Sequence, residues 1–182
     1  MSDVFIFTKF RIWVACLPLL LSGCSSGLGA LTGPRQELPV PLEITIMAAE
    51  NANPAINGRP SPVIVTLFEL SATSNFLSTD FFSLHSPGGA SLANELVGME
   101  QHSLLPGEIR VVHRKAGLRS RFLGATAGFR DLENSVWRTS IPLPAPYLSG
   151  RIITRGASPT KRLYVVVTDK SIVIRDKLEG LE

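Results

Sequence analysis

The chain has 182 residues, of which 45% are hydrophobic and 18% are charged, and its formal net charge is +3. This length and composition suit one globular domain with a packed core and exclude a largely disordered chain. The net charge is too small to indicate nucleic-acid binding, so we expect no nucleic-acid partner.

The first 23 residues have the pattern of a secretory signal peptide. Lys9 and Arg11 precede an apolar run from Ile12 to Leu21, and this run is shorter than the roughly 20 residues that span a bilayer. The next residues complete the sequence LSGC, which ends at Cys24 and resembles the lipobox of bacterial lipoproteins. A plain secretory signal followed by a free or buried thiol is the alternative.

We therefore assign residues 1–23 to a lipoprotein signal peptide and Cys24 to lipidation after cleavage. Two or more acyl chains give a stable membrane anchor. By resemblance to enterobacterial sorting, Ser25 after the cysteine indicates the outer membrane, with the domain facing the periplasm. Since Cys16 lies in the signal, the mature chain has no cysteine for a disulfide. Apart from the covalent lipid on Cys24, we expect no cofactor.

Residues 24–41 combine the lipidated cysteine with a Gly-, Ser- and Pro-rich stretch that predicts a flexible tether. Residues 42–182 should form one β-rich domain of about seven to eight short strands. Helical spacing of aromatic residues predicts a short helical insertion at about 71–97, with Ser78 or Thr79 capping a second helix. Residues 145–160 read as a loop. Predicted strands are 42–48, 63–70, 99–106, 108–114, 121–131, 135–144, 163–168 and 171–175. This pattern indicates a β-sandwich.

The sequence offers little that would support catalysis. The three histidines, at positions 85, 102 and 113, are far apart and have no zinc-site spacing. Neither a nucleophile elbow nor a phosphate-binding loop motif occurs in the sequence, and the carboxylates are scattered. We therefore expect a protein that is not an enzyme and that holds no metal.

Two charged segments each allow two interpretations. Five basic residues fall within 12 positions: Arg110, Arg114, Lys115, Arg119 and Arg121. They could attract anionic lipid headgroups or an acidic partner, but we favour a solvated turn between two strands. The segment FRDLENSVWR, residues 129–138, could be a recognition patch. We favour a strand corner in which the charges pair and Trp137 completes the core.

The loop AENANPAINGRPSP, residues 49–62, is the best candidate for recognition. It carries three Asn, three Pro and one Gly, and it is longer than a tight hairpin needs. Loops held by a rigid sheet carry recognition more often than the sheet itself. An idle connection between two strands is the alternative.

The order of these segments resembles that of a known family. The lipobox at Cys24 is followed by GRPSPV, STDFFSL, LLPGE and FRDLENSVWR, which together resemble the TssJ (VasD/SciN-like) family of outer-membrane lipoproteins of type VI secretion systems. The resemblance implies a mainly β, transthyretin-like two-sheet sandwich and no catalysis. It also implies that the protein binds the periplasmic C-terminal region of TssM, in a complex that TssL completes, and so anchors that complex to the outer membrane.

In the resemblance, the loop at 49–62 holds TssM. By position, this role falls on seven residues: Asn53, Pro54, Asn57, Gly58, Arg59, Pro60 and Ser61. Two other classes of function remain open. A periplasmic lipid-anchored solute- or glycan-binding module would need a concave pocket with convergent polar groups. A lipid-anchored hydrolase would need a nucleophile motif, which the sequence does not show.

Overall fold

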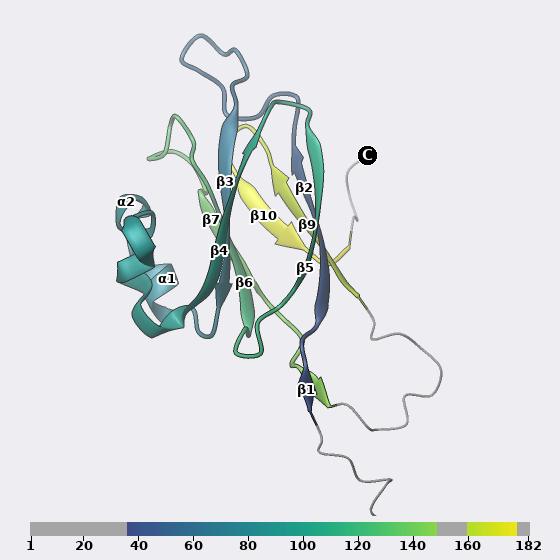
Figure 1. Cartoon of the computed structure of the whole chain (residues 1–182). Helices are drawn as coiled ribbons and strands as arrows, with labels where there is room; N and C mark the ends of the chain where they lie inside the picture. Colours follow the sequence, from purple (N-terminus) through teal and green to yellow (C-terminus); the bar gives the residue numbers. More distant parts are fainter. Residues whose placement is uncertain (1–35, 149–159, 178–182) are drawn as a thin grey trace, which may run out of the picture. The chain divides into compact units, whose positions relative to one another are not determined.

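The computed structural model describes residues 36–148 and 160–177 (Figure 1). The chain separates into two compact units, Met1–Gln36 and Glu37–Glu182, and all that follows concerns the second unit. The predictions for the signal peptide, Cys24 and most of the tether lie outside the described residues. Among the described residues, no helix is long and apolar enough to cross a membrane.

Two four-stranded sheets form the domain, with strand orders β10-β9-β2-β5 and β4-β3-β6-β7 (Figure 1). Neighbouring strands are antiparallel except β2 and β9, which are parallel. The strands are β2 Pro41–Ala48, β3 Val63–Leu70, β4 Leu96–Leu104, β5 Ile109–Lys115, β6 Phe122–Ala127, β7 Arg138–Pro142, β9 Lys161–Val167 and β10 Ile172–Arg175. A two-residue pair, β1 Glu37–Leu38 and β8 Tyr147–Leu148, adds a third small sheet. The predicted two-sheet sandwich is confirmed.

The main core lies between the two large sheets and follows the alternation seen in the sequence. In β2, Leu42, Ile44 and Ile46 are buried while their neighbours along the strand are partly exposed. Such a period of two turns every second side chain toward the facing sheet. These residues join one buried cluster that draws on both sheets.

The ordered domain begins earlier than the predicted boundary at residue 42. Glu37–Leu38 already pairs with β8, and Val40 is only 5% exposed in the core. The N–H of Ala116 donates to the carbonyl of Val40 at 2.9 Å. A single buried valine between two prolines has no period, so composition alone assigned this stretch to the tether.

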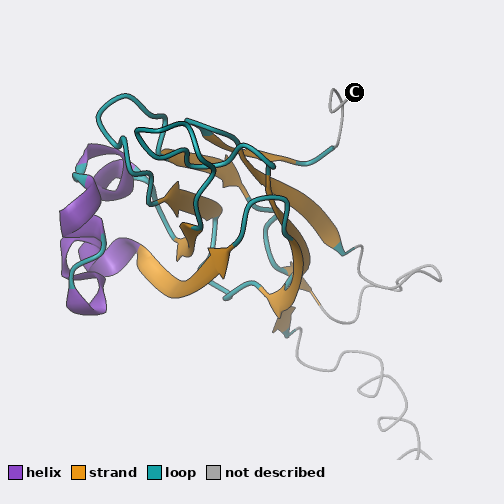
Figure 2. Ribbon diagram, turned by 90° about the horizontal axis from the view of Figure 1, so that it is seen from above, coloured by secondary structure: helices purple, strands orange, loops and turns teal. Residues whose placement is uncertain are grey.

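The helical insertion predicted for 71–97 is present as α1 Ser74–Ser78, α2 Phe81–Leu84 and the 3₁₀ helix η3 Pro87–Glu95. These helices cover the outer face of the β4-β3-β6-β7 sheet and lie on one side of the domain (Figure 2). They close a second buried cluster, made by Phe68, Leu70, Phe76, Leu84 and Leu92. A Cβ at Gly124 would lie 2.9 Å from Phe76 Cζ, so a glycine on β6 lets this ring rest directly on the sheet.

Side chains from other elements hold the ends of these short helices. The Glu95 carboxylate accepts hydrogen bonds from the backbone N–H groups of Asn75 and Phe76 at 3.0–3.2 Å. The Arg138 guanidinium donates to the carbonyl of Thr79 at 2.8 Å. Asp80, rather than the expected Ser78 or Thr79, caps α2. Helices of four or five residues are marginal alone, so these contacts and the buried face stabilise them.

The segment 129–138 turns the chain from β6 into β7, as the favoured interpretation expected. Trp137 packs against both buried clusters, and the Arg138 guanidinium lies 4.7 Å from the centroid of its ring. Asp131 forms an ion pair with Lys170 at 3.2 Å. Trp137 and Arg138 are therefore structural, whereas the first residues of the segment lie at the groove described below.

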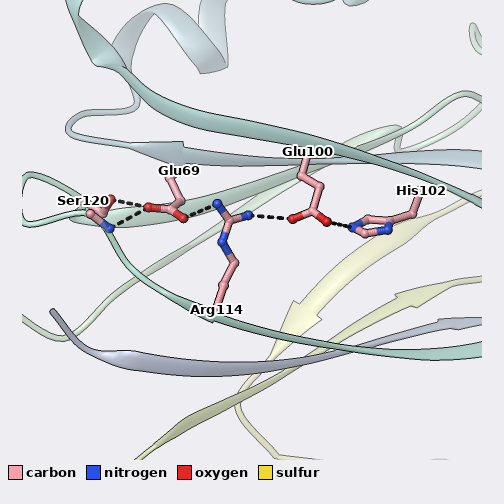
Figure 3. Close-up of polar contacts among 6 residues, drawn as sticks. Glu69, Glu100, His102, Arg114 and Ser120 are labelled. Carbon is pink, nitrogen blue, oxygen red and sulfur yellow. Dashed lines mark hydrogen bonds and ion pairs between the residues drawn. The ribbon is translucent and has the colours of Figure 1, made fainter.

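A chain of polar side chains crosses from one sheet to the other beside β4 and β5 (Figure 3). Arg114 on β5 forms ion pairs with Glu69 on β3 and with Glu100 on β4, the second at 3.2 Å. The Glu69 side chain is only 4% exposed, so its charge depends on this partner. One of the five clustered basic residues is thus an internal part of the fold.

His102, at the end of this network, predicts how stability depends on pH. Burial lowers the pKa of His102, nearby Arg110 and Arg114 lower it further, and Glu100 opposes them. Below about pH 6.5 the unfolded chain binds a proton that the folded protein resists, so stability falls as the pH drops from there. Urea unfolding at about pH 7.5 and about pH 5.5 should show this loss in the wild type.

The variant His102→Gln isolates this effect. It should show a smaller loss of unfolding free energy between the two pH values, because glutamine does not titrate. The carboxyl groups whose pKa is lowered, those of Asp80, Glu108 and Asp131, lose their contribution only at lower pH. An equal loss in the variant and the wild type would show that His102 does not cause it.

Candidate functional site

The loop at 49–62 is an ordered miniature hairpin that projects from one end of the sandwich, between β2 and β3 (Figure 1). The Ser61 N–H donates to the Ala52 carbonyl at 3.1 Å, and the Ala55 N–H donates to the Arg59 carbonyl at 2.8 Å. Gly58 closes the tip with a φ of +75°, a conformation that favours glycine. The backbone itself therefore sets the shape of this loop.

Asn53 ties the base of the loop to the connection between β6 and β7. Its side chain is buried, its Nδ2 donates to the Pro62 carbonyl at 2.7 Å, and its Oδ1 accepts from the Arg130 N–H at 2.8 Å. Its φ of +48° lies in the left-handed region, which asparagine tolerates better than most residues. Two segments that are 77 positions apart in sequence are joined by this one amide.

We expect Asn53→Gly to lower the free energy of unfolding by about 1–3 kcal/mol, because it removes two hydrogen bonds while keeping a residue that accepts the backbone angle. Asn53→Ala should cost about 1–2 kcal/mol more, since alanine is strained at positive φ. Urea unfolding measures both. Asn57→Ala is the matched control, because Asn57 is exposed and makes one hydrogen bond within its own turn. Equal unfolding free energies for Asn53→Gly and Asn57→Ala would contradict the anchoring role.

Three connections meet around an open groove of about 950 Å³ at this end of the domain. They are the 49–62 loop, the connection between β6 and β7, and the turn between β9 and β10. The groove is lined by Asn53, Pro54, Ala55, Ile56, Asn57, Phe129, Arg130, Asp131, Asp169 and Lys170. We call this set the loop-end groove.

Charges of both signs stand around the loop-end groove. The Asn134 amide donates to Asp131 Oδ1 at 2.8 Å, and Lys170 lies 3.2 Å from Oδ2 of the same carboxylate. These hydrogen bonds hold the pKa of Asp131 below its usual range, so the group stays ionised at neutral pH. Arg130 and Asp169 are exposed beside this pair. A partner must therefore match a mixed polar rim rather than a field of one sign.

The seven residues predicted to bind a partner divide into two groups. Asn57, Gly58, Arg59 and Pro60 are exposed at the tip, and Pro54 is half-buried along the groove. Asn53 and Ser61 are 3% and 7% exposed, so they support the loop from inside instead of presenting a surface. The prediction of direct contact therefore does not suit these two residues in this conformation.

The sequence-based prediction missed Ile56, which is fully exposed at the tip of the loop. It also missed the groove residues contributed by other connections: Arg130, Asp131, Asp169 and Lys170. Ile56 was open to discovery because it is a lone large apolar residue in a polar loop. Exposed isoleucine held on an ordered backbone costs solvation without stabilising the fold, which points to a partner.

A family model described as "Type VI secretion lipoprotein, VasD, EvfM, TssJ, VC_A0113" matches residues 40–167. The chain belongs to this family. It is therefore a type VI secretion lipoprotein, and the resemblance drawn from its motifs is confirmed. No curated protein matches the chain.

Solved structures support the same family. The type VI secretion lipoprotein TssJ1 from Pseudomonas aeruginosa is 28% identical, with a TM-score of 0.66 over 78% of this chain and 99% of that one. Serratia marcescens Lip, a membrane-bound component of the type VI secretion system, is 24% identical, with a TM-score of 0.68 over 78% and 100%. A chain from a structure named for the TssM C-terminal domain (869–1107) from EAEC is 20% identical, with a TM-score of 0.57 over 74% and 97%.

Among the described residues of this lipoprotein, no group of three or more His, Cys, Asp or Glu side chains could hold a metal ion. His85 is engaged within the fold, with Nε2 at 3.3 Å from Thr66 Oγ1 and 3.1 Å from Thr126 Oγ1. The loop-end groove is thus the best-formed candidate site in this part of the chain, and it has the character of a recognition surface.

Proposed function

We propose that this chain is an outer-membrane lipoprotein, lipidated at Cys24 and facing the periplasm. In this proposal it anchors the type VI secretion membrane complex by binding the periplasmic C-terminal region of TssM, with TssL in the same complex. Its role is structural and involves no catalysis. Family membership and the similarity to a chain from a structure named for the TssM C-terminal domain support TssM as the partner.

The arrangement of the domain's two ends is the observation that carries this proposal. The described chain enters at β1, and β2 then runs from Pro41 to Ala48 before the 49–62 loop begins (Figure 1). Eight strand residues at about 3.3 Å each separate these ends by roughly 25 Å. A protein that binds a membrane through its N-terminus and a partner through this loop can therefore engage both at once.

The loop-end groove has the features of a protein-binding surface. Its loop is ordered before binding, so little conformational entropy is lost when a partner docks. Ile56 supplies an apolar anchor at the centre, and polar and charged groups surround it. A central apolar residue inside a polar rim is the usual arrangement at protein interfaces.

A solute- or glycan-binding module is the alternative, and the volume of the groove lies within the range of ligand sites. However, Phe129 is the aromatic residue among the groove's lining residues, and it is only 7% exposed. It offers little ring surface on which a sugar could stack. The groove therefore suits a protein surface better than a sugar.

Isothermal titration of the mature chain, residues 24–182, with the periplasmic C-terminal region of TssM from the same genome tests the proposal. We expect saturable binding. Oligosaccharides of the cell envelope, titrated in the same cell, should give no heat of binding. Oligosaccharide binding without TssM binding would favour the alternative.

The membrane anchor gives a separate prediction. Cys24→Ser should move the protein from the membrane fraction to the soluble periplasmic fraction, because acyl chains on Cys24 supply the stable attachment. Cys16→Ser is the matched control, since Cys16 lies within the signal and should leave fractionation unchanged. Membrane retention of Cys24→Ser after a high-salt wash would contradict lipidation at this residue.

A further inference from the structure

The end of the domain where the chain enters carries a second exposed feature, the loop at 116–121 between β5 and β6. Leu118 and Arg119 form its turn, and Leu118 is 45% exposed. The loop lies at the opposite end from the loop-end groove, because β5 runs from Ile109 near Ala48 to Lys115 near Pro41. The proposed TssM contact therefore leaves this loop unused.

The buried Glu69 carboxylate holds the 116–121 loop in one conformation (Figure 3). Its Oε2 accepts hydrogen bonds from the Gly117 N–H at 2.8 Å and from the Ser120 hydroxyl at 2.7 Å. The Arg121 N–H donates to the Leu70 carbonyl at 2.8 Å. With its inner side fixed in this way, the loop presents the turn at 118–119 to solvent.

Gly117 shows how closely the loop is packed on its inner side. A Cβ at this position would lie 2.6 Å from Val97 Cγ1, a distance that real Cβ contacts essentially never show. Only glycine lets the backbone approach this closely. The exposed turn is therefore a supported projection of the sandwich.

The exposed cations of this loop are not neutralised by acidic side chains. Among the described residues, no ion pair links Lys115, Arg119 or Arg121 to a carboxylate, and all three are exposed. The Arg121 guanidinium donates to the carbonyls of Leu118 and Ser120, both at 2.9 Å, and keeps its charge. The loop therefore presents three positive charges around one exposed leucine.

Neighbouring strands at this end carry cations that are paired. Lys161 at the start of β9 lies 3.4 Å from Asp176, and Arg162 lies 3.2 Å from Glu43. Arg110, at the other end of β5, pairs with Glu108. The unneutralised positive charge of the basic segment is thus concentrated in the 116–121 loop and the adjoining Lys115.

This loop is bonded to the point where the chain enters the domain. The Ala116 N–H donates to the Val40 carbonyl at 2.9 Å, and Lys115 stands opposite Pro41 in the sheet. About 13 residues from Cys24 to Glu37 can span at most roughly 45 Å, so a lipidated chain keeps this end near the bilayer. Such tethering raises the effective concentration and makes a weak second contact effective.

We propose that Lys115 and the 116–121 loop form a membrane-binding face that contacts the headgroups of anionic phospholipids, with Leu118 entering the interfacial region. Lys and Arg near an anionic bilayer each strengthen binding about fivefold, which corresponds to about 1 kcal/mol. An exposed apolar residue among such cations is typical of interfacial contact. The inference rests on the proposed function in one respect, that the chain leads from this end to a lipid on Cys24.

Vesicle flotation of the mature chain carrying Cys24→Ser tests this face without the anchor and without TssM. The vesicles are phosphatidylcholine alone or phosphatidylcholine mixed with phosphatidylglycerol. We expect binding to the mixed vesicles only, with a decrease of about fivefold in Arg119→Gln and about 100-fold in the triple variant Lys115→Gln, Arg119→Gln, Arg121→Gln. Leu118→Ser should also weaken binding.

Arg110→Gln is the matched control, because it removes a positive charge from the same strand at the opposite end. It should bind the mixed vesicles as the wild type does, and a loss equal to that of Arg119→Gln would overturn the assignment to this face. Failure of the wild type to float with the mixed vesicles, or retention on peptidoglycan in their place, would also overturn it. These outcomes are independent of TssM binding, which the titration measures separately.

Discussion

Replacing Ile56 with aspartate should weaken binding of the TssM C-terminal region by about 30-fold or more, which corresponds to at least about 2 kcal/mol. Ile56 is fully exposed, so its side chain contributes no buried contact to the fold. In the complex it would fill an apolar pocket, and a carboxylate there would have to lose its water without a partner. Titration of wild type and variant measures the ratio of dissociation constants, and urea unfolding should show no loss of stability.

Leu105→Asp is the matched control for this prediction. Leu105 is 61% exposed in the turn between β4 and β5, and it lies outside the residues that line the loop-end groove. Its replacement adds the same charge at the same end of the domain and should leave binding within about twofold of the wild type. Equal weakening by the two variants would show that charge, rather than the position of Ile56, decides the affinity.

Replacing Arg114 with methionine should lower the free energy of unfolding by about 3–5 kcal/mol. The change leaves the Glu69 carboxylate, whose side chain is 4% exposed, without its ion-pair partner. The Gly117 N–H and the Ser120 hydroxyl remain, but neither carries a compensating charge. Urea unfolding at neutral pH measures the difference.

Two further variants separate the buried charge from the packing of the long side chain. Glu69→Gln in the Arg114→Met background removes the unpaired charge and should recover part of the lost stability. Arg110→Met removes the ion pair with the more exposed Glu108 and should cost less than about 1 kcal/mol. A cost below that value for Arg114→Met would contradict the role assigned to the network.

Strands with a strong period could be predicted closely from the sequence. β2 and β3 lie within one residue of their predicted bounds, because alternating or continuous apolar runs reflect burial directly. Val40 was missed because one buried residue between prolines has no period. The start of α2 was misplaced because Ser, Thr and Asp are all good N-caps, and only the backbone selects Asp80.

The position of the candidate site could be predicted, but the orientation of its residues could not. Loop length and composition identified 49–62, yet the burial of Asn53 depends on Arg130, which is 77 positions away. The order of strands in the sheets brings the turn at 169–170 to the same groove. Such long-range neighbours follow from topology, and a local pattern does not encode them.

The basic segment shows the same limit. Its residues are close in sequence, yet the structure separates them into an internal ion pair at Arg114, a surface pair at Arg110 and an exposed group at 115–121. Charge clustering alone could not make this division, since alternate strand residues face opposite sides of a sheet.

Hydrogen exchange of the mature chain, with and without the C-terminal region of TssM, tests the central claim most directly. The account predicts slower exchange on binding in the backbone amides of 52–61, and also of 129–131 and 169–170, which line the same groove. The 116–121 loop at the opposite end should be unchanged. Protection of that loop in place of 52–61, or binding that leaves 52–61 unprotected, would contradict the account.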